Sequence, residues 1–350
     1  MQTVVPTKLE LVRSLSKDLK TASKNLGRAE ARQLVDLYYQ MQDFRIGTAN
    51  QIRSIVQGNQ EEPCETIKFF RDNFQTLEDQ IKKVLDIYTD NDPVGIWAKS
   101  VVGIGPVIAA GLIANLDVEE RPTAGHFWSY CGLNDNNRPW LGREKTTKIV
   151  NEVLGNKKNK DIDYADFCMI CAKTQWNPDN LINATDNKGN SIFIKDGKYT
   201  FKKEDIIKQC SKRPYNARMK TLCWKAGQSF VKVSNNPNDI YGKIYQKRKA
   251  FELVANDKGE YKEQAKEKLE KYNIGKNTDA YKYYIEGKLP PAHIQARCER
   301  YAVKIFLSHL HKVMYMVKYG VEPPKPFAIS ILNHAHEIEC PFIDKIKEFI

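Results

Sequence analysis

An unbroken apolar repeat over residues 67–88 places the strongest constraint on the fold. Its members are Ile67, Phe70, Phe74, Leu77, Ile81, Val84 and Tyr88, at alternating intervals of three and four residues. This spacing puts all of them in one stripe along an α-helix, because a helix turns once every ~3.6 residues. The same alternation predicts two earlier helices, with stripes formed by Val12, Leu15, Leu19, Ala22 and Leu26 and by Leu34, Leu37, Met41, Phe44 and Ile55.

The segment between the second and third predicted helices favours a reversal of the chain. It runs from Gly58 to Pro63 and is rich in turn-forming residues. Residues 1–95 are therefore expected to form a helical hairpin or coiled coil. The stripes fit an intramolecular bundle and a homodimer equally well. A dimer needs a second apolar face, and we expect Val35, Tyr38, Phe69 and Leu85 to supply one.

The charge balance favours a polyanionic partner. The chain has 350 residues, with 55 Lys and Arg against 43 Asp and Glu, and a net charge of +12. This excess is larger than solubility requires, so nucleic acid is the first expectation and an anionic membrane surface the second. The longest apolar run, residues 101–116, is interrupted by glycine and proline, and it predicts no membrane span. Eight scattered cysteines and no signal peptide indicate a reduced, cytoplasmic protein.

A Gly-x-Gly turn lies between two apolar segments. The turn is Gly103-Ile104-Gly105, and Pro106 follows it directly. Glycine allows a positive φ and lets a ligand approach the backbone closely, and proline is favoured in the first turn of a helix. The segment therefore predicts a helix-hairpin-helix whose second helix binds a phosphate with the free N–H groups at its start.

The residues around this turn fit a contact with the DNA backbone. Ile104 is expected to fix the turn to the core, and Val107 lies in the first turn of the second helix. Lys99 is expected to add a positive charge at the same phosphate. The alternative is a closely packed helix pair that uses Gly-x-Gly only for packing. We favour the DNA contact because the chain is basic, and such a contact implies little sequence preference.

Three blocks of sequence resemble, in order, the C-terminal domain of the DEDD-type insertion-sequence transposases, the family of bridge-RNA-guided recombinases and Piv-like invertases. The blocks are residues 103–110, 123–133 and 211–222, and the segment 292–319 is similar to the family's closing helix. The resemblance covers roughly residues 10–135 and 211–325. It implies a helix-hairpin-helix DNA-binding domain preceded by a coiled coil. It also implies that the third block faces DNA through Lys212, Arg213, Arg218 and Lys220.

Two departures from the family bear on catalysis. The family begins with a RuvC-like nuclease domain that binds divalent metal, whereas here helices are expected from about residue 8. The family's catalytic serine follows the second block, but residues 134–145 contain no serine. The nearest hydroxyls belong to Thr146 and Thr147, and Ser211 lies further along. These three are weak nucleophile candidates, and the resemblance therefore does not imply strand transfer by this chain.

An insertion separates the second and third blocks, at residues 136–210. It contains Asp196-Gly197 between two β-prone runs, which predicts a β-hairpin. Phe193, Tyr199 and Phe201 lie on these runs and allow base stacking, although an ordinary structural hairpin is the preferred interpretation. Cys168 and Cys171 form a single CxxC without a second pair, so no zinc site is predicted.

Together these patterns predict a mostly α fold. The expected parts are a helical hairpin or coiled coil over residues 1–95, a helix-hairpin-helix domain over 96–135 and 211–325, the α/β insertion, and a C-terminal extension over 326–350.

The expected function is DNA binding, to duplex or branched DNA, as a homodimer, without a metal or other cofactor. RNA binding is compatible with the same charges. An active recombinase using a hydroxyl nucleophile and a structural protein of a viral or mobile-element assembly remain as alternatives. The predicted DNA-binding residues are Lys99, Gly103, Ile104, Gly105, Val107, Lys212, Arg213, Arg218 and Lys220.

Overall fold

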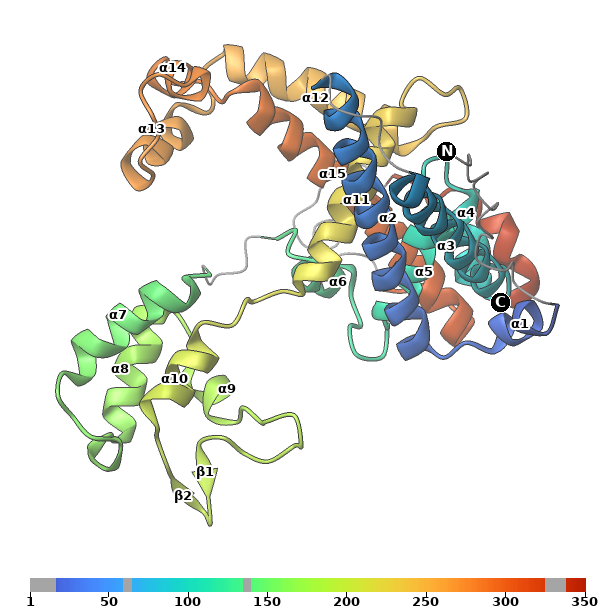
Figure 1. The fold of residues 1–350 in the computed structure, drawn as a ribbon. Helices are drawn as coiled ribbons and strands as arrows, with labels where there is room; N and C mark the ends of the chain where they lie inside the picture. Colours follow the sequence, from blue (N-terminus) through green and yellow to red (C-terminus); the bar gives the residue numbers. More distant parts are fainter. Residues whose placement is uncertain (1–16, 59–64, 135–139, 325–337) are drawn as a thin grey trace, which may run out of the picture. The chain divides into compact units, whose positions relative to one another are not determined.

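The computed structural model describes residues 17–58, 65–134, 140–324 and 338–350. These residues are mostly α-helical, and their only sheet has two strands, which confirms the predicted fold class. Figure 1 shows the course of the chain. The described residues form two compact units, one of Met1–Phe127 with Thr221–Ile350 and one of Trp128–Lys220. The start of the first predicted helix, with Val12 and Leu15, and the turn over residues 59–63 lie outside the described residues.

The first unit is built from long helices and short connecting turns. Its elements are α1 (Lys17–Ala22), η1 (Ser23–Asn25), α2 (Arg28–Gln57), α3 (Glu65–Asp90), α4 (Pro93–Ser100), α5 (Pro106–Asn115), α12 (Tyr241–Asp257), α13 (Lys262–Lys271), α14 (Asp279–Ile285), α15 (Pro291–Tyr319) and η3 (Ile343–Phe349). Two further helices, α6 (Ala124–Tyr130) and α11 (Ala217–Val233), cross from one unit to the other.

Helix α5 is the centre of the first unit. Its sequence is apolar on every side, and a helix of this kind is stable only when it is surrounded. Helices α2, α3 and α4 pack against it. The small residue Gly111 allows the close approach, because a Cβ there would lie 2.7 Å from Leu222 and 3.4 Å from Val35. Trp97 of α4 extends the same core and stacks on Phe306 of α15, with 5.9 Å between ring centroids.

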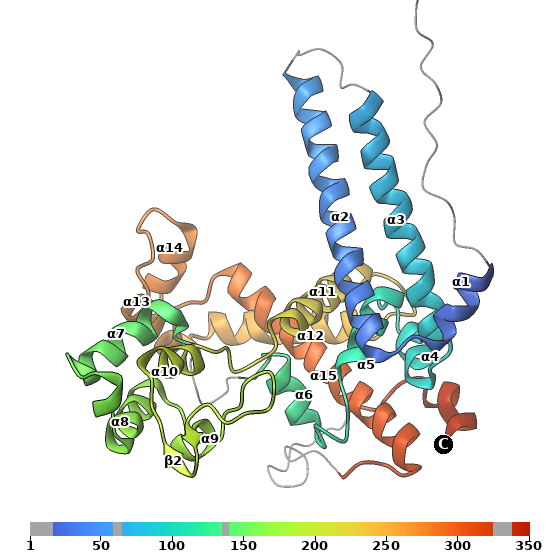
Figure 2. The same cartoon turned by 60° about the horizontal axis from the view of Figure 1, so that its bottom comes forward.

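Helices α2 and α3 run side by side and antiparallel (Figure 2). Their ends nearest α5 bury Val35 and Leu85. The expectation that these two residues supply a second, dimer-forming face is therefore wrong, since the core around α5 already covers them. Some members of the predicted stripes are exposed instead, among them Phe44 and Phe70, which are 55% and 52% exposed.

The second unit has its own small core. Its elements are α7 (Gly142–Leu154), η2 (Asn159–Asp161), α8 (Tyr164–Thr174), α9 (Pro178–Ile182), β1 (Ile194–Lys195), β2 (Lys198–Tyr199) and α10 (Lys203–Cys210). The strands pair antiparallel around Asp196 and Gly197, which both have positive φ, so the predicted Asp-Gly hairpin is present. Phe193 and Phe201 are buried against Phe167 and are not available to stack on bases.

The units divide the chain differently from the expected domains. Residues 1–95 share a unit with the segments that follow, because α2 and α3 are part of the core around α5. The insertion forms most of the second unit, whose ends lie at Trp128 and Lys220 rather than at residues 136 and 210. Residues 338–350, the described part of the expected C-terminal extension, belong to the first unit. Trp97 of that unit donates its indole N–H to the carbonyl oxygen of Pro341 at 2.7 Å.

The turn between α4 and α5 is fastened to α11. Gly103 has φ +95°, and its carbonyl oxygen accepts a hydrogen bond from the Ser229 hydroxyl at 2.6 Å. A Cβ at Gly103 would lie 3.1 Å from Val233 and 3.2 Å from Ser229. Ile104 buries its side chain in the core, as expected. Position 103 therefore needs glycine for both its dihedral angle and its space.

Alanine substitutions at Gly103 and Gly105 should show that only position 103 requires glycine. Gly103→Ala should lower the free energy of unfolding by about 2–3 kcal/mol, because it adds a strained φ and a tight contact. Gly105→Ala should cost only about 0.5 kcal/mol, since Gly105 has φ −90° and a Cβ there meets no atom within 4 Å. Chemical denaturation of both variants measures the difference. Equal losses would show that the turn is not held as described.

Candidate nucleic-acid interface

The start of α5 faces solvent although the rest of the helix is buried. Gly105 is the N-cap residue and is exposed, and Pro106 is the first helical residue, as predicted. Proline has no N–H group, so the N–H groups of Val107 and Ile108 are the first that lack an acceptor within the helix. The side chain of Val107 is buried, so this residue can offer a ligand only its backbone. Free N–H groups and the positive end of the helix dipole together favour an anion here.

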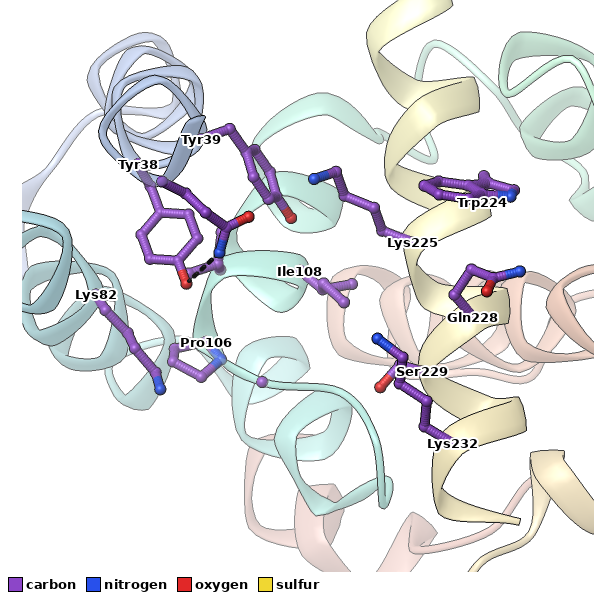
Figure 3. A pocket seen from close by; sticks show the side chains of 13 residues that line it. Tyr38, Tyr39, Lys82, Pro106, Ile108, Trp224, Lys225, Gln228, Ser229 and Lys232 are labelled. Atoms are coloured by element: carbon purple, nitrogen blue, oxygen red, sulfur yellow. Dashed lines mark hydrogen bonds between the residues drawn. The ribbon is translucent and has the colours of Figure 1, made fainter. Parts of the chain in front are cut away.

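A pocket of about 420 Å³ opens at this helix start (Figure 3). Its walls come from α2, α3, the beginning of α5 and α11. The lining residues are Tyr38, Tyr39, Gln42, Lys82, Gly105, Pro106, Val107, Ile108, Trp224, Lys225, Gln228, Ser229 and Lys232. Among these described residues there are three lysines and no aspartate or glutamate. The pocket is therefore positively charged.

The three lysines reach the pocket from two different helices. Lys82 comes from α3, and Lys225 and Lys232 come from α11; Figure 3 shows Lys82 beside Pro106 and Lys225 directed at Tyr39. Within the part of the chain that the structure describes, none of the three forms an ion pair. No described carboxylate is within ion-pair distance of them, although Asp43 acts on Lys225 from further away, and the three charges remain available to an anionic ligand.

Lys225 is the most constrained of these cations. Its ammonium group lies 3.7 Å from the centre of the Tyr39 ring, which holds it by a cation–π interaction. Burial lowers the pKa of Lys225, because a charged group loses hydration, and the carboxylate of Asp43 opposes this shift only in part. An anion bound in the pocket would restore a stabilising charge beside this ammonium group.

The two tyrosines of the pocket stay neutral at physiological pH. Burial, with help from the nearby carboxylate of Glu78, raises the pKa of Tyr38 to about 12. Burial likewise raises the pKa of Tyr39. Both phenols therefore keep their protons and do not repel an anion.

Lys99 does not take part in this site, contrary to the prediction. Its ammonium group forms ion pairs with Asp86 at 2.6 Å and Asp90 at 2.5 Å, and its side chain is only 17% exposed. Burial opposes protonation of Lys99, but the hydrogen bonds to the two carboxylates outweigh it and raise the pKa. The physical reason for the error is that α3 presents two acidic residues to α4, and the sequence of α4 alone does not reveal them.

The other predicted DNA-binding residues belong to the second unit. Lys212, Arg213, Arg218 and Lys220 are all exposed. Arg213 lies over the Trp140 ring at 4.5 Å, and Lys220 lies over Tyr215 at 4.3 Å. The unit holds 18 Lys and Arg residues against 11 Asp and Glu residues. Its excess of seven positive charges is more than half of the net charge of the whole chain.

The predicted set is thus divided between the two units. Gly103, Ile104, Gly105 and Val107 lie in the first unit, and the residues of the third block lie in the second. Helix α11 belongs to both, with Arg218 and Lys220 near its start and Lys225 and Lys232 further along. Lys82, Lys225 and Lys232 were not among the residues predicted from the sequence. The lysines of α11 follow directly on the basic third block, which is the one signal in the sequence that pointed toward them.

The hydroxyl candidates for a nucleophile are poorly placed for attack. Thr146 is fully buried and donates to the carbonyl oxygen of Gly142 at 2.6 Å. Thr147 and Ser211 likewise donate to backbone carbonyls, those of Arg143 and Lys208. A nucleophilic hydroxyl needs an adjacent general base, and the acceptors here are carbonyl oxygens.

Among the described residues, no group of three or more His, Cys, Asp and Glu side chains is arranged to hold a metal ion. In the same part of the chain, none of the helices has the length and apolar character to cross a membrane.

Comparison with family models, with curated proteins and with solved structures found no match to this chain.

Proposed function

We propose that this chain is a DNA-binding protein similar to the C-terminal part of a transposase. It holds a backbone phosphate at the start of α5, and the basic residues of the second unit make further phosphate contacts. The observation that carries the proposal is the pocket at the start of α5, where three lysines that form no ion pair with a described residue line the space next to the first backbone N–H groups of the helix. Duplex or branched DNA is the proposed partner, and an RNA backbone offers the same phosphates.

Electrostatics supports this assignment over a purely structural role. Lysines kept for solubility are usually scattered over a surface, whereas these three line one pocket, with Lys82 and Lys232 exposed and Lys225 partly buried. Bringing like charges together in a partly buried site costs free energy, which a bound polyanion returns. The resemblance of residues 103–110 to the transposase helix-hairpin-helix supports the same assignment from the sequence.

Gly105 offers a direct test of phosphate binding at the start of α5. Gly105→Glu should fold normally, because the new side chain has room and a carboxylate near a helix start is favourable. Its charge should nevertheless repel the phosphate and block the N–H groups. We expect the affinity for duplex DNA to fall about 10- to 100-fold, measured by fluorescence anisotropy. Gly105→Ala is the control and should bind like the parent; an unchanged affinity for Gly105→Glu would refute the contact.

The salt dependence of binding tests the lysines. If the three pocket lysines contact phosphates, a plot of log affinity against log salt should have a slope of roughly −2.7 or steeper. Lys82→Gln, Lys225→Gln and Lys232→Gln should each make the slope shallower by about one unit, equally for all DNA sequences. Lys99→Gln should leave it unchanged, because that lysine is paired within the protein. Circular dichroism checks folding, and unchanged slopes for the folded pocket variants would contradict the proposal.

We also propose that the chain forms a homodimer through α2 and α3. These helices expose several large apolar residues that a single copy of the first unit leaves uncovered. They are Leu37, Phe44, Ile46, Val56 and Phe70. Leu37 and Phe44 are seven residues apart and share one side of α2, and a second copy of the helical pair would cover them together with Phe70 of α3.

Charge introduced on this face should prevent association. The parent is expected to sediment as a dimer at micromolar concentration, and Phe70→Glu should sediment as a monomer because the carboxylate would be buried without a partner. Phe251→Glu alters an equally apolar, exposed position on α12 and should remain dimeric. A parent that is monomeric throughout the micromolar range would rule out the dimer.

A further inference from the structure

We propose that the pocket at the start of α5 holds an unpaired nucleotide of a DNA strand, with its base on Trp224 and its phosphate among Lys82, Lys225 and Lys232. This inference rests on the proposed DNA binding and names the form of DNA that the site selects. It favours gapped, frayed or branched DNA over an intact duplex, because a paired base is held inside the helix and cannot enter a pocket.

The size of the pocket exceeds what a phosphate contact requires. Its volume of about 420 Å³ falls in the range of ~300–1,000 Å³ that is typical of pockets for small organic ligands. A hairpin that only touches the duplex backbone needs a few N–H groups at the surface. Here the helices α2, α3 and α11 add walls beside those groups, in a depression that is open to solvent. The additional volume is suited to a base and its sugar.

The aromatic lining has one ring free to stack. Lys225 already covers Tyr39, at 3.7 Å from the ring centre. Trp224, on the neighbouring position of α11, is 58% exposed and lines the same pocket. Stacking of a base on an exposed indole removes apolar surface of both groups from water. Any of the bases can stack in this way, because every base has a π-face. Trp224 is therefore the stacking platform.

The polar lining fits the edge of a base as well as its phosphate. Gln228 donates its amide N–H to Glu299 at 2.8 Å. That bond uses one of the two amide N–H groups, so Gln228 retains its carbonyl oxygen as an acceptor and one N–H as a donor. The three lysines supply the charge for the phosphate. Cations and an aromatic platform in one pocket are the groups that single-strand binding sites combine.

Three DNA molecules of one sequence test the inference by fluorescence anisotropy. The first is an intact duplex, the second carries a short single-stranded gap, and the third carries abasic sites opposite the gap, which keep the phosphates but lack the bases. The parent should bind the gapped DNA about 5- to 100-fold more tightly than the duplex. The abasic DNA should bind like the duplex, because it offers nothing to stack.

Variants assign this preference to the pocket. Trp224→Ala should bind the duplex like the parent but lose the preference for gapped DNA, and Trp224→Phe should retain most of it. Phe251→Ala removes an aromatic ring that is also 58% exposed, on α12, and should leave the preference unchanged. Circular dichroism confirms folding of each variant. If Trp224→Ala keeps the full preference, the pocket does not hold the base and the inference is wrong.

The outcomes separate the failure of this inference from the failure of DNA binding. If the parent binds all three DNA molecules equally and with steep salt dependence, DNA binding stands and the base pocket is refuted. If it binds none of them, both proposals fall. A nucleoside monophosphate added as competitor should displace gapped DNA only weakly, since it lacks the neighbouring phosphates. Strong displacement would show that the pocket serves a free nucleotide, and would overturn the strand proposal.

Discussion

The burial of α5 is the constraint on which the first unit depends. A helix with an apolar surface on every side must be covered, and α2, α3 and α4 cover it. This packing leaves the helix start, at Gly105 and Pro106, as the part of α5 that reaches solvent. The same helices that protect the core therefore also form the walls of the pocket, and the candidate site is a direct consequence of how the core is closed.

The charge of a lysine is available to a ligand at this site only if the lysine does not form an ion pair with a carboxylate of the protein. Lys99 lies close in sequence to the turn, but Asp86 and Asp90 neutralise it. Lys82 and Lys232 lie far from the turn in sequence and are unneutralised among the described residues, and Lys225 is held by the face of Tyr39. A basic composition alone identifies a class of partner, whereas the distribution of carboxylates selects the residues that contact it.

The second unit combines a conventional core with an excess of positive charge. The aromatic residues of its hairpin illustrate the division of roles, since Phe193 and Phe201 close the core and Tyr199 is exposed. Its basic residues, including Arg213 over Trp140, surround that core. Because α11 runs from this unit into the wall of the pocket, one helix carries basic residues of both units.

Local patterns in the sequence were sufficient for the long helices α2, α3 and α15, the start of α5 at Pro106, the positive φ of Gly103 and the Asp196-Gly197 hairpin. Each of these depends on residues adjacent along the chain, where periodicity and backbone sterics act directly. Only tertiary packing decided three other features. Lys99 is paired with two aspartates, and Val35 and Leu85 are buried. Lys82, Lys225 and Trp224 line the same pocket. These features join segments that are scores of residues apart, and side-chain contacts across such distances follow from how whole helices pack, which no local pattern encodes.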